Sequence, residues 1–226
     1  MTAVKICGLS TPETVDACVA AGAAYVGFVF YPPSPRSVSP EIAQTLARRL
    51  PTGVRSVGLM VTPSDDELRD IVATVPLDVI QLHGNETPER VREIRNTVSM
   101  PVMKAVRIAD SDDVDSAMAY VGVCDMLLFD ARAPDNVVAL PGGNGLTFDW
   151  SLIKGRQWPL PWLLSGGLTP ETVAEAISAT GAPGVDVSSG VEDRPGVKSV
   201  EKIEKFIQNA ADASLSPQPA TPETSS

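Results

Sequence analysis

The chain has 226 residues, of which 43% are hydrophobic, and its formal net charge is −10 at pH 7. A chain of this length and apolar content can bury a substantial core, in one large domain or two small ones. The excess of negative charge argues against nonspecific binding to nucleic acid or to anionic lipid, so a phosphorylated ligand needs a local positive site. No apolar run reaches the roughly 18 residues of a membrane span, and the first residues show no charged region followed by a signal core. We therefore expect a cytoplasmic protein.

The three cysteines and the one histidine limit the possible metal and redox sites. Cys7, Cys18 and Cys124 are odd in number and far apart, which predicts neither a disulfide framework nor a C-x-x-C site. A zinc site built from protein ligands is not expected in a chain whose single histidine is His83. We therefore predict no metal site.

The chain begins with a short apolar stretch, AVKICG at residues 3–8, which predicts a strand that ends on Cys7. Side chains alternate faces along a strand, so Lys5 and Cys7 point to the same side. A nearby ammonium favours the thiolate form of a cysteine, which is the form that can act as a base or nucleophile. A lone buried cysteine is more often a packing residue. The rest of the chain must decide between these two interpretations.

One pattern recurs along the chain: a short apolar run is followed by a hydroxyl residue and a proline. Hydroxyl N-caps with proline at the first helical position are typical of helix starts. The apolar runs are rich in valine and aromatic residues and are short enough to be buried parallel strands. The pattern occurs at Thr11-Pro12-Glu13, Ser39-Pro40-Glu41, Thr62-Pro63-Ser64, Thr87-Pro88-Glu89 and Thr169-Pro170-Glu171.

These βα units, with further apolar runs, predict eight strands near residues 3, 25, 55, 79, 102, 125, 162 and 184. The spacing is mostly about 22 to 30 residues, and eight such units close into a (β/α)₈ TIM barrel. A doubly wound open sheet is disfavoured, because no G-x-G-x-x-G follows the first strand and no strand is left for a second half. We expect a barrel domain over residues 1–211 and a disordered tail, rich in Pro, Ser and Thr, over residues 212–226.

Four side chains fall at the carboxyl ends of predicted strands or in the loops that follow, where barrels of this class hold their active sites. They are Cys7, Arg36, His83 and Asp130. Each has an ordinary alternative. Asp130 could cap a helix or turn, Arg36 could be a solvated loop charge, and His83 could be satisfied by a backbone carbonyl.

The last two predicted strands end in small residues, Ser165-Gly166-Gly167 and Ser188-Ser189-Gly190. Such residues let backbone N–H groups approach an anion, and the loops after strands seven and eight are the usual phosphate site of this fold. A third run, Gly142-Gly143-Asn144-Gly145, follows strand six and is interpreted as a mobile lid over the same site. Together the three segments favour a phosphorylated ligand.

The chain resembles the phosphoribosylanthranilate isomerase family, and the resemblance covers nearly everything except the tail. Two departures are Asn144, where threonine or serine is common, and residues 58–61, where a phenylalanine is common. The segments that carry the resemblance are KICGL at 5–9, GFVF at 27–30, SPRSVSPE at 34–41, QLHGNE at 81–86, FD at 129–130, GGNGLTFDW at 142–150, LSGGL at 164–168 and DVSSGVEDRPGVKS at 186–199.

The resemblance implies an isomerase of tryptophan biosynthesis that performs an Amadori rearrangement without metal, nucleotide or redox cofactor. Its substrate would be N-(5′-phosphoribosyl)anthranilate and its product 1-(2-carboxyphenylamino)-1-deoxy-D-ribulose 5-phosphate. By the same resemblance Cys7 is the general base, tuned by Lys5, and Asp130 is the general acid.

The resemblance also implies the substrate contacts. Arg36 would bind the anthranilate carboxylate through its forked donors, and the loop around Gly143 and Gly145 would close over the substrate. His83 and Asp186 would have supporting roles. The phosphate would be held by the backbone around Gly166, Gly167, Ser188 and Ser189.

Three other functions are weighed against this one. A metal-dependent phosphosugar epimerase would need paired histidines, and indoleglycerol-phosphate synthase would need a lysine acid and glutamates at strand ends. A catalytically silent barrel would tolerate replacement of both Cys7 and Asp130.

We expect a small phosphorylated substrate as the partner, no nucleic acid or membrane, and a monomer or homodimer.

Overall fold

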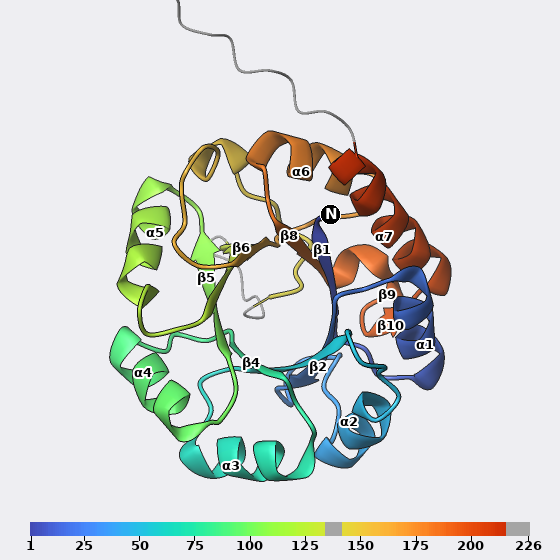
Figure 1. Cartoon of the computed structure of the whole chain (residues 1–226), viewed down its shortest axis with the longest axis vertical. Helices are drawn as coiled ribbons and strands as arrows, with labels where there is room; N and C mark the ends of the chain where they lie inside the picture. Colours follow the sequence, from blue (N-terminus) through green and yellow to red (C-terminus); the bar gives the residue numbers. More distant parts are fainter. Residues whose placement is uncertain (134–141, 216–226) are drawn as a thin grey trace, which may run out of the picture.

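The computed structural model describes residues 1–133 and 142–215. Its eight parallel strands close into one barrel in the order β1 to β8, as predicted (Figure 1). The barrel closes between β1 and β8, where Lys5 lies opposite Asp186 in the strand register. The strands are β1 (Ala3–Cys7), β2 (Tyr25–Phe30), β3 (Arg55–Met60), β4 (Val79–Leu82), β5 (Val102–Ile108), β6 (Met126–Ala131), β7 (Trp162–Leu164) and β8 (Gly184–Val187).

The helices form a ring around the strands (Figure 1). A two-stranded sheet, β9 (Glu192–Arg194) with β10 (Val197–Lys198), follows β8, and short 3-10 helices lie at Ala117–Tyr120, Trp150–Leu152 and Ser189–Val191. No helix of the described residues is long and apolar enough to cross a bilayer. The α-helices are α1 (Pro12–Ala21), α2 (Pro40–Ala47), α3 (Asp65–Thr74), α4 (Pro88–Thr97), α5 (Ser111–Ser116), α6 (Val173–Thr180) and α7 (Val200–Leu215).

Three of the five predicted helix starts are confirmed, since Thr11, Ser39 and Thr87 accept hydrogen bonds from backbone N–H groups at the starts of α1, α2 and α4. Two begin later than predicted. The N-cap of α3 is Ser64, because its hydroxyl and Glu67 form a reciprocal capping box. Helix α6 begins at Val173, because the backbone N–H of Thr169 donates to the Thr172 hydroxyl in a local turn.

Helix α7 continues to Leu215, past the expected domain end at residue 211. The rest of the predicted tail, residues 216–226, lies outside the described residues. The same holds for residues 134–141, between β6 and the glycine-rich segment.

Alternation along the strands separates two layers of packing. Outward side chains such as Val4 and Ile6 join the large core between the strands and the helices. Inward side chains form a second, smaller apolar cluster that fills the barrel: Val57, Val79, Met103, Ala105, Met126, Leu128 and Leu163. On three of these strands the next inward position is polar, since Gln81 follows Val79, Asp130 follows Leu128 and Ser165 follows Leu163, each two residues later.

Candidate active site

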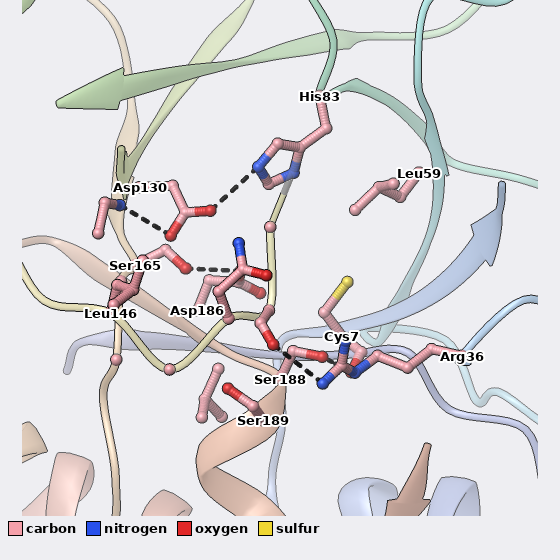
Figure 2. A pocket seen from close by; sticks show the side chains of 18 of the residues that line it. Cys7, Arg36, Leu59, His83, Asp130, Leu146, Ser165, Asp186, Ser188 and Ser189 are labelled. Atoms are coloured by element: carbon pink, nitrogen blue, oxygen red, sulfur yellow. Dashed lines mark hydrogen bonds and ion pairs between the residues drawn. The ribbon is translucent and has the colours of Figure 1, made fainter. Parts of the chain in front are cut away.

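One pocket opens at the carboxyl ends of the strands (Figure 2). The structure brings together there almost all of the side chains predicted for the site, which come from β1, β4, β6, β8 and the loops between the elements. Lys5 does not line the pocket itself, since it is fully buried next to Cys7. The predicted residues that line the pocket are Cys7, Arg36, His83, Asp130, Gly143, Gly145, Gly166, Gly167, Asp186, Ser188 and Ser189.

Cys7 and Lys5 share the inward face of β1, as predicted. Gly27 of the neighbouring strand makes room for both, since a Cβ atom there would lie 3.0 Å from the Cys7 sulfur and 3.3 Å from Lys5 Nζ. The Lys5 ammonium donates to Asp186 Oδ1 at 2.8 Å, and the Ser165 hydroxyl donates to Asp186 Oδ2 at 3.1 Å. The cation beside the thiol is therefore already paired with a carboxylate.

That pairing changes the expected electrostatics of Cys7. Burial raises the pKa of the Cys7 thiol, Asp186 adds to the rise, and Lys5 opposes it without offsetting it. The expectation that Lys5 favours the thiolate has the correct direction, but the net effect on the Cys7 pKa is the reverse. Burial would by itself lower the pKa of Lys5, but Asp186 and Cys7 together raise it, so Lys5 stays an ammonium.

Asp130 and His83 meet on another side of the pocket (Figure 2). Nε2 of His83 lies 3.1 Å from Asp130 Oδ2, and the backbone N–H of Ala131 donates to Asp130 Oδ1 at 2.9 Å. Both side chains are buried, with exposed fractions of 5% for His83 and 8% for Asp130. Gly142 covers the pair, because a Cβ atom at that position would lie 2.9 Å from the imidazole and 3.0 Å from Asp130 Oδ2.

Gln81 completes this chain of contacts and was missed by the sequence analysis. Its side-chain Nε2 lies 3.0 Å from Nδ1 of His83, in a buried position. The sequence did contain a signal for it, because Gln81 lies two residues before His83 and side chains two residues apart share one face of a strand. Among the described residues, the imidazole of His83 thus bonds to two side chains and not to a backbone carbonyl.

Arg36 is buried, with an exposed fraction of 5%, so it is not a solvated loop charge. Its Nε and Nη2 donate to the two carboxylate oxygens of Glu192 at 2.7 and 2.9 Å, and Nη2 also donates to the carbonyl of Gly143 at 3.1 Å. Gly8 lies against the stem, since a Cβ atom there would lie 2.8 Å from Cδ of Arg36. The other terminal nitrogen of Arg36, Nη1, takes part in none of these hydrogen bonds.

Glu192 and Lys198 connect Arg36 to the last loop and were not predicted. Lys198 Nζ donates to Glu192 Oε1 at 2.7 Å and to the Ser188 carbonyl at 2.9 Å. The Ser188 hydroxyl in turn donates to the carbonyl of Cys7 at 3.1 Å. Burial would raise the pKa of Glu192, but Arg36 and Lys198 lower it, so Glu192 is a carboxylate. These contacts join the Arg36 side of the pocket to the predicted phosphate loop.

The small residues after β7 and β8 lie together at the rim of the pocket. Gly166 and Gly167 have φ angles of 92° and 63°, which L side chains rarely adopt. A Cβ atom at Gly166 would lie 2.9 Å from the backbone nitrogen of Ala131, so the close approach also requires glycine. Within residues 1–133 and 142–215, no group of His, Cys, Asp and Glu has an arrangement that could hold a metal ion.

Comparisons with known proteins agree with one another. The family model described as "N-(5'phosphoribosyl)anthranilate (PRA) isomerase" matches residues 4–209. The chain is 58% identical over 208 residues to an N-(5′-phosphoribosyl)anthranilate isomerase of Rhodospirillum centenum, covering 92% of this chain and 97% of the relative. It is 58% identical over 207 residues to that of Paracoccus denitrificans, covering 92% and 96%.

Solved structures show the same likeness. The phosphoribosyl anthranilate isomerase of Thermotoga maritima superposes with a TM-score of 0.84 at 39% identity, covering 94% of this chain and all (100%) of that one. A further structure of a phosphoribosyl anthranilate isomerase, solved in complex with reduced 1-(o-carboxyphenylamino)-1-deoxyribulose 5-phosphate, gives a TM-score of 0.80 at 38% identity, with the same coverage of 94% and 100%.

Proposed function

Because the chain belongs to the N-(5′-phosphoribosyl)anthranilate isomerase family of tryptophan biosynthesis, we propose that Asp130 and Cys7 are the acid and the base of its reaction. The reaction is the Amadori rearrangement of N-(5′-phosphoribosyl)anthranilate to 1-(2-carboxyphenylamino)-1-deoxy-D-ribulose 5-phosphate. The observation that carries the proposal is that a thiol from β1 and a carboxyl group from β6 line one pocket, both nearly buried.

Asp130 acts first. Its protonated carboxyl group gives its proton to the furanose ring oxygen, the bond from that oxygen to C1′ breaks, and the amine lone pair forms a protonated Schiff base at C1′. Asp130 becomes a carboxylate in this step. Nε2 of His83 and the backbone N–H of Ala131 lie within hydrogen-bond distance of its two oxygens.

Cys7 acts second, as a thiolate that removes the proton from C2′ and leaves an enolamine. The raised pKa of Cys7 makes the thiolate scarce at neutral pH but a stronger base where it forms. The enolamine then gains a proton at C1′ while its C2′ hydroxyl loses one, which gives the ketone. The proton count closes when the thiol protonates C1′ and the Asp130 carboxylate takes the hydroxyl proton, and no step requires a metal or a redox cofactor.

The two charged ends of the substrate fit the two polar sides of the pocket. Arg36, oriented by Glu192, would present Nη1 to the anthranilate carboxylate. The backbone of the loops after β7 and β8 would hold the phosphate, as is usual in this fold. The segment with Gly143 and Gly145 lines the same pocket and would cover the bound substrate.

Loss of anthranilate fluorescence tests the proposal. EDTA-treated wild-type protein should consume N-(5′-phosphoribosyl)anthranilate rapidly, and Asp130→Asn should lose about 10²- to 10⁴-fold in kcat. Asp112→Asn, an exposed change in α5, is the matched control and should keep full turnover. Absence of decay with folded wild-type protein would refute the substrate, and retained turnover in Asp130→Asn would refute the acid.

A further inference from the structure

Gln81 is a fully buried polar side chain that the reaction above does not use. Its Nε2 lies 3.0 Å from Nδ1 of His83, while its Oε1 is buried and has no hydrogen-bond partner among residues 1–133 and 142–215. A buried acceptor without a partner costs about 1–3 kcal/mol. Position 81 therefore holds an amide at a cost to stability, where an apolar side chain would fill the barrel, as Val79 does two residues earlier.

The contact with Gln81 determines where His83 carries its proton. An amide nitrogen can only donate, so Nδ1 of His83 must accept and cannot itself be protonated. A neutral imidazole then has its one proton on Nε2, from which it donates to Asp130 Oδ2.

We propose that Gln81 is a positioning residue of the isomerisation, which holds the proton of the His83 imidazole on Nε2 so that His83 can stabilise the carboxylate formed at Asp130. This inference rests on the proposed function, in which Asp130 is the acid. Hydrogen bonds to a charged acceptor are stronger than those to a neutral one, so the contact with His83 strengthens as Asp130 gives up its proton.

The other tautomer of His83 would hinder the reaction. With the proton on Nδ1, the Nε2 lone pair would face the negative charge that develops on Asp130. Gly142 packs against both side chains, which limits water near this pair and increases the electrostatic effect of the misplaced proton.

The proton on His83 can be observed directly, because His83 is the one histidine of the chain. We would record ¹⁵N NMR spectra of histidine-labelled protein without substrate, over a pH series that extends well into the alkaline range. Wild-type protein should carry the proton on Nε2. Gln81→Glu, whose carboxylate accepts, should move a proton to Nδ1, and its kcat should fall about tenfold or more while KM stays within about twofold.

Two further variants separate this role from packing. Gln81→Met removes donor and acceptor at similar volume, and should give a mixture of the two tautomers with a smaller loss of kcat. Met103→Leu is the matched control, since Met103 lies opposite Gln81 in the sheet register and fills the barrel interior. It should keep both the wild-type spectrum and the wild-type kcat.

Three results would overturn the inference: a proton on Nδ1 in the wild-type protein, an unchanged spectrum in both Gln81 variants, or a moved proton with unchanged kcat. If Gln81→Glu does not fold, the wild-type spectrum and the spectrum and kcat of Gln81→Met still test the inference. Failure of the proposed function would be distinguishable, because it would appear as missing wild-type turnover or as an active Asp130→Asn, and the spectra require no substrate.

Discussion

Two of the buried lysine–carboxylate pairs, Lys5 with Asp186 and Lys104 with Glu86, lie on opposite faces of the barrel strands. The pocket pair, Lys5 with Asp186 at 2.8 Å, lies inside the barrel beside Cys7. The loop pair, Lys104 with Glu86 at 2.6 Å, lies on the outward face of β5, because Met103 and Ala105 on either side of Lys104 point inward. The chemistry of the two pairs is the same, but their surroundings differ.

The loop pair serves the backbone. Glu86 accepts from the backbone N–H groups of Thr62 and Gly84, and Lys104 donates to the carbonyl of Gly84. Burial lowers the pKa of Lys104 even though Glu86 opposes the shift. This pair therefore holds the loops after β3 and β4 together.

The pocket pair, in contrast, adjoins a group that can change its charge. The pKa of Lys5 is raised, because Asp186 and Cys7 together outweigh its burial. The comparison teaches that two ion pairs of the same chemistry differ in what they can influence, because only Lys5 with Asp186 lies against a titratable group of the pocket. The predictions below test that difference, beginning with the titratable group.

The largest effect is expected for Cys7→Ser. A hydroxyl is a far weaker base than a thiolate, so kcat should fall about 10²- to 10⁴-fold while the protein folds normally. Steady-state kinetics and thermal unfolding measure the two quantities. Cys18→Ala is the matched control, because Cys18 is also buried but belongs to α1, outside the pocket. Near-normal turnover in Cys7→Ser would refute the role of the pocket pair as well as that of the base.

A smaller effect on activity is expected for Lys5→Met. Lys5 opposes the raised pKa of Cys7, so its loss should raise that pKa further. The wild-type kcat/KM should increase with pH as the thiolate forms, and in the variant this increase should move to higher pH, with about tenfold lower kcat/KM near neutral pH. The unpaired Asp186 should also lower the free energy of unfolding by about 3–5 kcal/mol. An unchanged pH profile would show that Lys5 does not influence the pKa of the base.

The smallest effect on activity is expected for Lys104→Met. Loss of one partner leaves Glu86 buried and unpaired, so the free energy of unfolding should fall by about 3–5 kcal/mol. Because no residue of the pair lines the pocket, kcat should stay within about twofold of wild type and the pH profile should not move. Denaturant unfolding measures the free energy of unfolding, and steady-state kinetics measure kcat and the pH profile. A shifted pH profile would mean that the two pairs do not differ as proposed.

The sequence by itself determined the barrel and the end of the barrel at which the predicted site residues gather. Hydroxyl-proline helix starts and apolar runs are local features, and both recur often enough to define the βα units. The two-residue alternation of a strand placed Lys5 and Cys7 on one face without knowledge of any other strand. The starts of α3 and α6 were misplaced, because a hydroxyl and a proline fit a local turn as well as a helix N-terminus.

Only the tertiary structure decided which charged and polar groups pair. Lys5 and Asp186 are 181 positions apart in the sequence, and Arg36 and Glu192 are 156 apart, so closure of the barrel creates both contacts. Gln81 acquires its role through His83 and Asp130, which meet across different strands. The pKa of Cys7 depends on burial and on Asp186 as well as on its sequence neighbour. Electrostatic interactions depend on distance and burial in space, which is why the sequence located the thiol but not its charge state.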